Sequence, residues 1–454
     1  MAFSNILETF VEKSPVTVMA QALIERVLNV NRLDDWFERV SEDQYTRTLL
    51  FSSVFDMMLH VVCGTKSSIN EAFKHNEENI AVSLTSVYNK INGISVNTSA
   101  ELVRNVAKEI KAVIQASGGE RPSLLVGYNV LMLDGNCIES SDHRISELRN
   151  LTAGALPGKS LVVYDPALGI AVDVFPCEDG HAQERSIMPE VIETVRPYDL
   201  WIADRNFCTI RILTGINDKM GAYIIRQHKN LPFEEIDKLK YAGKTDSGKV
   251  YQQKVKIIGL DGNESIIRRV KIALNSPIRK GETEIFMLTN LPEEDAKAKQ
   301  IAELYRDRWK IETSFQHLEK NLNSEINSLG YPKAALFGFC VALVASNLVE
   351  AIFGSLRGAY GHERIDEEVS SFYISSELSV MHSGMMLIVP GEDWRQIGDM
   401  IDDDFSEFLK LCASKINLRV YQKSKRGVKK PPPKKVDTGS PHVSTFKLIS
   451  ERQT

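Results

Sequence analysis

Two short apolar runs that each end in an aspartate constrain the fold of this chain more than any other feature. The run Val130–Leu133 precedes Asp134, and the run Leu200–Ala203 precedes Asp204. Short apolar runs bounded by turn residues predict strands. An aspartate at the end of one strand is more often a turn residue or a helix cap than a functional group. The meaning of this pair therefore depends on what the rest of the chain places near it.

The character of the chain changes at about residue 120. Residues 1–120 carry apolar residues at helical spacing, which predicts a helical N-terminal domain. Binding to a DNA end is the use we favour for it, and a plain packing domain is nearly as well supported. In residues 121–220, strands and one helix fit a mixed sheet flanked by helices. The helix is expected over 182–194, and the strands over 124–126, 130–133, 161–164, 170–175 and 200–203.

Residues 221–290 predict a β-rich insertion. Two apolar-rich runs flank Asp261-Gly262-Asn263, which indicates a β-hairpin. Basic and apolar residues alternate here, so the basic face is either solvated or turned towards DNA. The basic residues are Lys254, Lys256, Arg268, Arg269, Lys271, Arg279 and Lys280.

Helices are expected again from residue 291 onwards. One helix should cover about 294–321, with Trp309 in the core, and a second lies in the apolar run 334–356 of the segment 291–360. The most apolar part of that run is too short to span a bilayer, so a buried core helix is expected. A C-terminal helical region, 361–418, should contain helices near 364–369 and 405–416.

Composition predicts a soluble, reduced, cytoplasmic protein without a membrane partner. The chain has 454 residues, 43% of them hydrophobic and 25% charged, and its six cysteines show no metal-ligand spacing. The net charge of −5 hides a basic tail, 419–454, which has eight basic residues and no acidic one between Arg419 and Lys435. Such a tail would contact DNA phosphates without reading bases, through Lys425, Arg426, Lys429 and Lys430, unless it is merely solvated.

The run Tyr305-Arg-Asp-Arg308-Trp-Lys-Ile-Glu312 gives the two aspartates a candidate partner. A helix turns about 100° per residue, which places Tyr305 and Arg308 within about 40° of Glu312. The same pattern also occurs on solvated helices, where Arg308 and Glu312 would form an i,i+4 pair. Three carboxylates without a Cys/His cluster suit Mg²⁺ or Mn²⁺, and two such ions can cut and join phosphodiester bonds.

These residues resemble a family of bacterial insertion-sequence transposases, the family numbered four, whose signature is Tyr-(2)-Arg-(3)-Glu-(6)-Lys. The resemblance includes Asp134-Gly135, Asp204-Arg-Asn-Phe207, Leu288-Thr-Asn-Leu-Pro292 and Pro441-His-Val-Ser-Thr445. It implies a ribonuclease-H-like catalytic core in an α/β fold, interrupted by the β-rich insertion. It also implies an Asp-Asp-Glu triad of Asp134, Asp204 and Glu312, which would bind two metal ions.

The resemblance further implies that Tyr305 and Arg308 contact phosphates near the element's end. At the family's Lys position this chain has Glu319, and Lys320 follows it. Lys320 would then take over the phosphate contact, or that contact is weakened.

The expected function is that of a DNA transposase, associated with the nucleoid. It would act on terminal inverted repeats and target DNA, as a dimer when two ends are held together. A domesticated DNA-binding relative and a ribonuclease-H-like nuclease with a host role are the alternatives.

Overall fold

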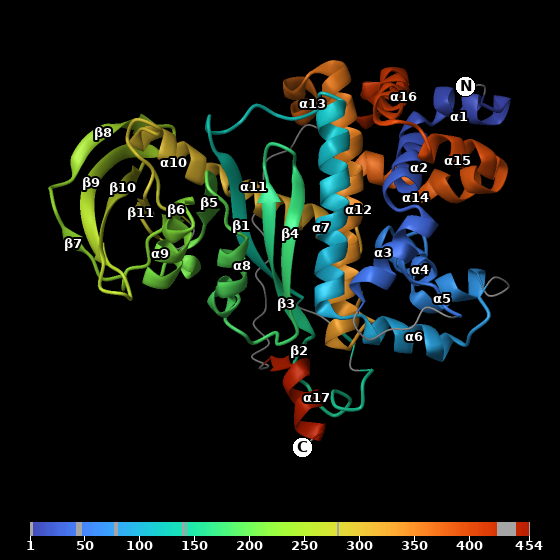
Figure 1. Cartoon of the computed structure of the whole chain (residues 1–454), viewed down its shortest axis with the longest axis horizontal. Helices are drawn as coiled ribbons and strands as arrows, with labels where there is room; N and C mark the ends of the chain where they lie inside the picture. Colours follow the sequence, from blue (N-terminus) through green and yellow to red (C-terminus); the bar gives the residue numbers. More distant parts are fainter. Residues whose placement is uncertain are drawn as a thin grey trace.

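A computed structural model describes residues 3–41, 48–76, 80–138, 141–142, 144–278, 281–424 and 442–453. Within these residues a ten-stranded mixed sheet has the order β4-β3-β1-β5-β6-β11-β10-β9-β7, with β8 paired to β9. The chain therefore folds as a mixed α/β protein (Figure 1). The strands of this sheet are β1 (Asn129–Ile138), β3 (Gly158–Asp165), β4 (Ile170–Cys177), β5 (Asp199–Ala203), β6 (Ala222–Arg226), β7 (Glu234–Glu235), β8 (Lys240–Thr245), β9 (Gly248–Ile258), β10 (Glu264–Leu274) and β11 (Glu284–Thr289).

Parallel pairing at the centre of the sheet sets the register of the two aspartates. Strand β5 pairs in parallel with both β1 and β6, whereas β3, β4 and β7–β11 pair antiparallel. Leu133 of β1 lies opposite Ala203 of β5. Asp134 and Asp204 are the next residues of these two adjacent strands, about 4.8 Å apart in the hydrogen-bonding direction.

Helices cover both faces of the central strands, as the buried apolar runs require. One face packs on α8 (Met188–Thr194) and α9 (Ile210–Asp218). The other face packs on α10 (Ala298–Asp307) and α11 (Trp309–Asn321) beside β1, β5 and β6. At β3 and β4 this second face is covered by α7 (Val96–Ala116) and α12 (Pro332–Tyr360).

The N-terminal and C-terminal helices share one hydrophobic core around α12 (Figure 1). Close approach of glycine backbones lets α12 cross the end of α7: a Cβ on Gly358 would lie 2.0 Å from the carbonyl oxygen of Ser117. The helices of this core are α1 (Asn5–Lys13), α2 (Pro15–Val27), α3 (Val30–Val40), α4 (Phe51–Val62), α5 (Ile69–His75), α6 (Leu84–Gly93), α13 (His362–Glu368), α14 (Ser371–Ile388), α15 (Gly391–Gly398) and α16 (Asp402–Lys415).

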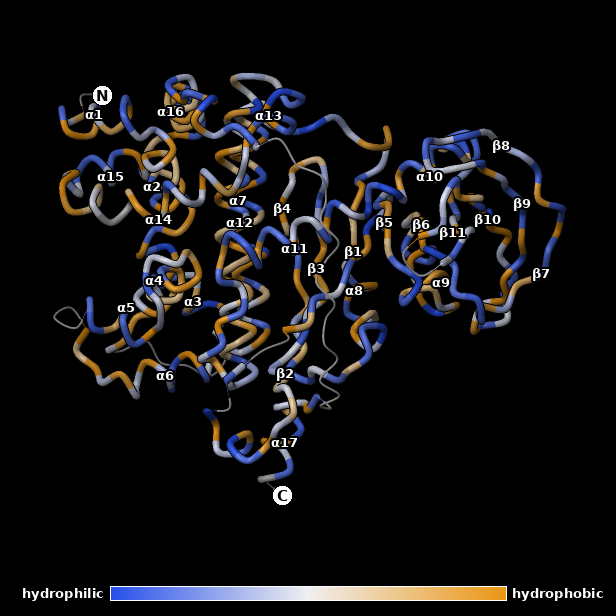
Figure 2. The backbone as a smooth tube through the Cα atoms, turned by 180° about the vertical axis from the view of Figure 1, so that it is seen from behind, coloured by the Kyte–Doolittle hydropathy of each residue, from blue (hydrophilic) through white to orange (hydrophobic). Residues whose placement is uncertain are grey.

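Helix α12 confirms the expected core helix over 334–356. Among the described residues it is the one helix with the length and apolar composition to cross a bilayer, but 83% of its most apolar window is buried inside the protein. In Figure 2 its hydrophobic stretches lie at the centre of the molecule, whereas the outer strand β8 is largely hydrophilic. Asn347 of this helix ties it to the sheet: its side-chain nitrogen donates to the backbone oxygen of Ala171, and its side-chain oxygen accepts from the Ala171 N–H.

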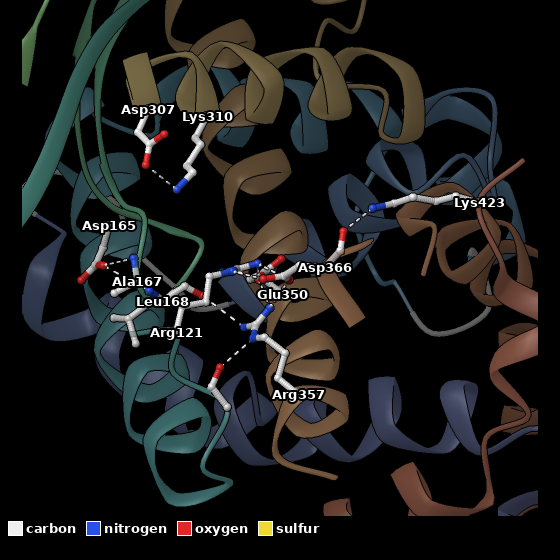
Figure 3. Close-up of polar contacts among 11 residues, drawn as sticks. Arg121, Asp165, Ala167, Leu168, Asp307, Lys310, Glu350, Arg357, Asp366 and Lys423 are labelled. Atoms are coloured by element: carbon white, nitrogen blue, oxygen red, sulfur yellow. Dashed lines mark hydrogen bonds and ion pairs between the residues drawn. The ribbon is translucent and has the colours of Figure 1, made fainter. Parts of the chain in front are cut away.

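A partly buried ionic cluster, here called the α12 cluster, joins the segment after α7 to α12 and α13. It contains Arg121, Glu350, Arg357 and Asp366 (Figure 3). Arg357, whose side chain is 1% exposed, donates to Glu350 at 2.6 Å and to the Gly119 carbonyl oxygen at 2.6 Å. Arg121 donates to Asp366 at 2.7 and 2.9 Å and to Glu350 at 3.1 Å. Two guanidinium groups thus balance two carboxylates.

The structure also corrects several expectations. Residues 124–126 form a bend instead of a strand, and the expected helix over 294–321 is two helices that meet at Arg308. Trp309 is 60% exposed, so its assignment to the core was wrong.

The hairpin at Gly262 is confirmed by the pairing of β9 with β10. Arg268 on that hairpin is buried and donates to the backbone oxygens of Leu291, Pro292 and Ala296, so it faces neither solvent nor DNA.

The C-terminal segment after α16 is only partly described. A 3₁₀ turn, η4 (Leu418–Tyr421), is followed after the gap by β12 (Val443–Ser444), which pairs with β2 (Ala155–Leu156), and by α17 (Thr445–Gln453). The predicted DNA contacts Lys425, Arg426, Lys429 and Lys430 lie outside the described residues, as do Arg279 and Lys280.

Candidate active site

The register of β1 and β5 places two acids on one face of the sheet. Side chains alternate along a strand, so Asp134 lies on the same face as Met132. Asp204 follows β5 directly and occupies the N-cap position of the 3₁₀ turn η3 (Arg205–Phe207). Met132 and the β5 residue Ile202 pack in the core that includes α10 and α11. Both carboxylates are therefore directed towards the helix pair that carries the third acid.

The third acid sits just beyond a break between those helices. Arg308 has α-helical backbone angles, but the Arg308 N–H bonds to the Tyr305 carbonyl and the Ile311 N–H bonds to the Arg308 carbonyl. These i→i−3 bonds form a tight turn that separates α10 from α11. Glu312 then falls in the first turn of α11, with its side chain 44% exposed.

Arg308 holds two of the three acids together. Its Nη1 donates to Asp134 Oδ2 at 2.8 Å, and its Nη2 donates to Glu312 Oε1 at 2.5 Å. The Tyr305 hydroxyl donates to Asp204 Oδ1 at 3.4 Å. The Arg308 guanidinium lies 5.9 Å from the centre of the Tyr305 ring. The residues brought together in three dimensions are thus Asp134, Asp204, Tyr305, Arg308 and Glu312.

The charges in this cluster act strongly on one another. The pKa of Asp134 is raised to about 6, chiefly by burial and in addition by the negative charges of Glu312 and Asp204, while Arg308 and the Gly135 N–H oppose the rise. Burial also raises the pKa of the Tyr305 hydroxyl to about 12. Burial alone would lower the pKa of Arg308, but Tyr305, Asp134 and Glu312 raise it above its usual value. The guanidinium is therefore charged at neutral pH.

The donor set suits a hard divalent cation, although a guanidinium now takes its place. The cluster offers three carboxylates, and oxygen ligands of this kind suit Mg²⁺ or Mn²⁺. A cation, Arg308, already bridges two of them. Within the described part of the chain, no three Asp, Glu, His or Cys side chains are grouped as they must be to hold an ion. The residues fit the metal by chemistry, and the arrangement of their side chains is closed around Arg308.

Lys320 is not brought to this cluster. It lies in the last turn of α11, exposed, two turns beyond Glu312. Among the described residues no hydrogen bond or ion pair joins it to the three acids. Its contact with phosphate remains a prediction.

Sequence reasoning missed a carboxylate that packs against Gly135, the residue after Asp134. Glu184, in the 3₁₀ turn η2 (Glu184–Ser186), lies so close to Gly135 that a Cβ there would be 2.3 Å from Glu184 Oε1. Asn206 donates to Glu184 Oε2 at 3.2 Å. Asn206 belongs to the Asp204-Arg-Asn-Phe207 motif, and this motif was the sequence feature that could have pointed to Asn206. Glu184 had no signal, because only the fold brings its turn against β1.

A basic cavity of about 770 Å³ opens beside Asp204. Arg205 and Arg226 both pair with Glu282 inside it, and Arg269 stacks on Phe286 with its guanidinium 4.0 Å from the ring centre. The cavity lies between the end of β5 and the insertion strands. Its lining residues are Arg205, Asn206, Arg226, Gln227, His228, Lys229, Phe233, Arg269, Glu282, Glu284 and Phe286.

Comparison with protein families identifies the domain that contains most of this site. The family described as "Transposase DDE domain" matches residues 153–348. Residues 153–348 are thus similar to a transposase DDE domain. The matched range includes Asp204, Tyr305, Arg308 and Glu312, whereas Asp134 lies before it. The four-residue signature is not tested by this match and stays a prediction.

Two curated transposases of insertion sequences are similar to part of this chain. The putative transposase InsL for insertion sequence element IS186A, from Escherichia coli strain K12, is 26% identical over 121 residues, which is 24% of this chain and 32% of that protein. The transposase for insertion sequence element IS421, from Escherichia coli, has the same identity and coverage. The aligned part thus spans about a third of these relatives.

One solved structure, a piggyBac transposase synaptic complex with hairpin DNA, aligns over 84% of both chains. The identity is 11% and the TM-score is 0.37, too low to support an argument about this chain.

Proposed function

We propose that this protein is a DNA transposase of a bacterial insertion sequence. It cuts at the ends of the element and joins the freed 3′-OH to target DNA. The observation that carries the proposal is the meeting of Asp134, Asp204 and Glu312 at one end of β1 and β5, with Asp204 and Glu312 inside the DDE domain. The ribonuclease-H-like assignment of the core and its division into domains belong to the same proposal.

Asp134, Asp204 and Glu312 would hold the metal ions, Mg²⁺ or Mn²⁺. Two such ions supply Lewis-acid stabilisation of the phosphodiester and a nucleophile at neutral pH. Three acids from different elements would then set where the scissile phosphate lies, because Arg308 bridges Asp134 and Glu312 and Tyr305 contacts Asp204. No Ser, Cys or Tyr nucleophile is required, which agrees with Tyr305 being buried with a raised pKa.

The DNA end would extend from the acids into the basic cavity. Arg205 and Arg226 are paired with the same carboxylate, Glu282, and Arg269 lies flat on an aromatic ring. Guanidinium groups bind phosphate in a planar, two-pronged geometry. Tyr305, Arg308, Lys320 and the basic tail would add further contacts. Two chains would hold two DNA ends, and the protein would work in the cytoplasm on the nucleoid.

A cleavage assay on a labelled duplex tests this function. The substrate is the terminal inverted repeat that flanks the gene, incubated with full-length protein and Mg²⁺ or Mn²⁺. We expect Asp204→Ala to lower the cleavage rate by about 10²–10³-fold or more, because one of the groups that stabilise the transition state is lost. DNA affinity, measured by fluorescence anisotropy, should change less than threefold.

Asp218→Ala is the matched control, because Asp218 is an exposed acid at the end of α9. It should cleave like the unmodified protein. If Asp204→Ala still nicks the end at the normal rate, the assignment is wrong. If the unmodified protein binds the repeat but never cuts it in Mg²⁺ or Mn²⁺, a non-transposing DNA-binding protein is the better description.

A further inference from the structure

We propose that Arg308 is an exchangeable counter-ion: without DNA it occupies the place of the metal, and it must leave before the acids can bind a divalent ion. This inference rests on the proposed function, since it concerns the same three carboxylates. It adds a control step, in which access of metal to Asp134 and Glu312 depends on the position of one side chain.

The contacts of Arg308 are incompatible with metal binding by the same atoms. Its two Nη atoms donate separately to Asp134 Oδ2 and Glu312 Oε1 at 2.8 and 2.5 Å. Mg²⁺ requires its oxygen ligands at about 2.0–2.1 Å in near-octahedral geometry. A guanidinium between the two carboxylates keeps them from closing on a common ion. This explains why, in the part of the chain that the structure describes, the acids do not form a metal-binding group.

The guanidinium is enclosed but incompletely bonded. The Arg308 side chain is 8% exposed, and its buried Nε has no hydrogen-bond partner. A buried hydrogen-bond donor without a partner costs free energy. The hydrogen-bonding capacity of the Arg308 side chain is therefore not fully used in this position. Arg357 differs, because its Nε donates to the Gly119 carbonyl oxygen at 2.6 Å, although Arg121 of the same cluster also has a buried Nη1 without a partner.

The local backbone allows Arg308 to move. Arg308 is the single residue between α10 and α11, and the bonds on either side of it are of the i→i−3 type. Hinges are commonly such residues at the ends of elements. A small change there would swing the guanidinium away from Asp134 without unfolding either helix.

A DNA phosphate is the group that would take Arg308 from the acids. Phosphate and carboxylate present a guanidinium with similar pairs of oxygens. The basic cavity begins next to the site. The Asp204 carboxylate contacts Tyr305, and the residues that follow Asp204 line the cavity. DNA and metal would both bind better once Arg308 has left the acids. By thermodynamic linkage, each would then increase the affinity of the protein for the other.

Titration of the full-length, DNA-free protein with Mn²⁺ by isothermal calorimetry tests the exchange. We expect Arg308→Ala to bind Mn²⁺ at least about tenfold more tightly than the unmodified protein, because no guanidinium has to be displaced. Arg306→Ala is the matched control: Arg306 lies two residues away and pairs with the exposed Asp246, so its removal should leave the Kd unchanged. Adding Glu312→Gln to Arg308→Ala should abolish the gain.

Arg308→Lys protects the test against a fold defect in the alanine variant. Lysine is a point charge that can neutralise one acid at a time. The Kd of Arg308→Lys for Mn²⁺ should therefore lie between those of the unmodified protein and Arg308→Ala. Equal Kd values for the unmodified protein, Arg308→Lys and Arg308→Ala would overturn the exchange.

Failure of the exchange can be told apart from failure of the proposed function. If the unmodified protein cleaves its ends and Asp204→Ala does not, the transposase assignment stands whatever the titration of Arg308→Ala shows. If no cleavage occurs, the assignment falls, while a tighter Kd for Arg308→Ala still supports the exchange at these carboxylates.

Discussion

Two arginine–carboxylate clusters in this protein look alike in composition but differ in charge balance. In the α12 cluster, Arg121 and Arg357 face Glu350 and Asp366, so two positive groups match two negative ones. In the site, Arg308 is the guanidinium that bridges Asp134 and Glu312, with Asp204 as a third acid. A buried cluster whose charges balance can serve as a joint between elements. A cluster with surplus negative charge is suited to additional cations.

Arg357 and Arg308, the central arginines of the two clusters, also differ in how completely they are buried and hydrogen-bonded. Arg357 is 1% exposed and also donates to backbone oxygens, which hold it in one position. Arg308 contacts a glutamate that is 44% exposed and leaves its own Nε without a partner. Burial with complete bonding gives rigidity, whereas partial bonding at an exposed edge permits replacement by another cation.

Removing the balanced arginine should have the largest effect on stability. Arg357→Met removes the buried partner of the half-buried Glu350 and leaves it with Arg121 alone. Breaking a buried ion pair costs about 3–5 kcal/mol. Chemical denaturation followed by circular dichroism measures the loss, which Mn²⁺ should not reverse. The control Arg364→Met removes an exposed pair with Glu368 and should cost less than about 1 kcal/mol. Equal losses for Arg357→Met and Arg364→Met would show that the α12 cluster does not act as a joint.

Removing the site arginine should cost less and respond to metal. Arg308→Ala takes one guanidinium from Asp134 and Glu312, with an expected loss of about 1–3 kcal/mol in metal-free buffer containing EDTA. Because a divalent ion would replace the lost charge, Mn²⁺ at about ten times its Kd should restore about 1.4 kcal/mol. The same denaturation experiment with and without Mn²⁺ measures this recovery. A loss that Mn²⁺ cannot reduce would remove the distinction between the two clusters.

The smallest loss of stability is expected when one arginine and one carboxylate are removed together from the α12 cluster. Arg357→Met combined with Glu350→Leu leaves Arg121 paired with Asp366 through bonds of 2.7 and 2.9 Å. Apolar replacement of a whole buried pair is often neutral, so the double variant should lose less than about half of what Arg357→Met loses alone. Additive losses in a double-mutant cycle would show that the two side chains are not coupled.

Local patterns predicted most of the elements that form the sheet. The apolar runs before Asp134 and Asp204 became β1 and β5, and the turn at Gly262 became the hairpin of β9 and β10, because burial and turn geometry act over a few residues. The prediction for Trp309 failed for a tertiary reason. As a large aromatic residue in an expected helix it was assigned to the core, but the helix breaks at Arg308, and Trp309 begins α11 with 60% exposure.

Arg268 shows the same limit on the insertion. In sequence it alternates with apolar residues like any basic residue on a solvated strand. In the fold, three backbone oxygens from the segment before α10 converge on it and make its burial favourable. That segment follows β11, which pairs with β10 only in the complete sheet.

The amino-acid sequence by itself determined which residue types this protein can use: two strand-end aspartates, a run that carries Tyr305, Arg308 and Glu312, and a basic tail. Only the tertiary structure decided that Arg308 lies between Asp134 and Glu312 and that Glu184 reaches Gly135. Local order follows from forces between neighbours in the chain. Contacts between distant residues depend instead on the parallel register of β1 with β5 and on the packing of α11 against β1, which arise only when the whole core packs.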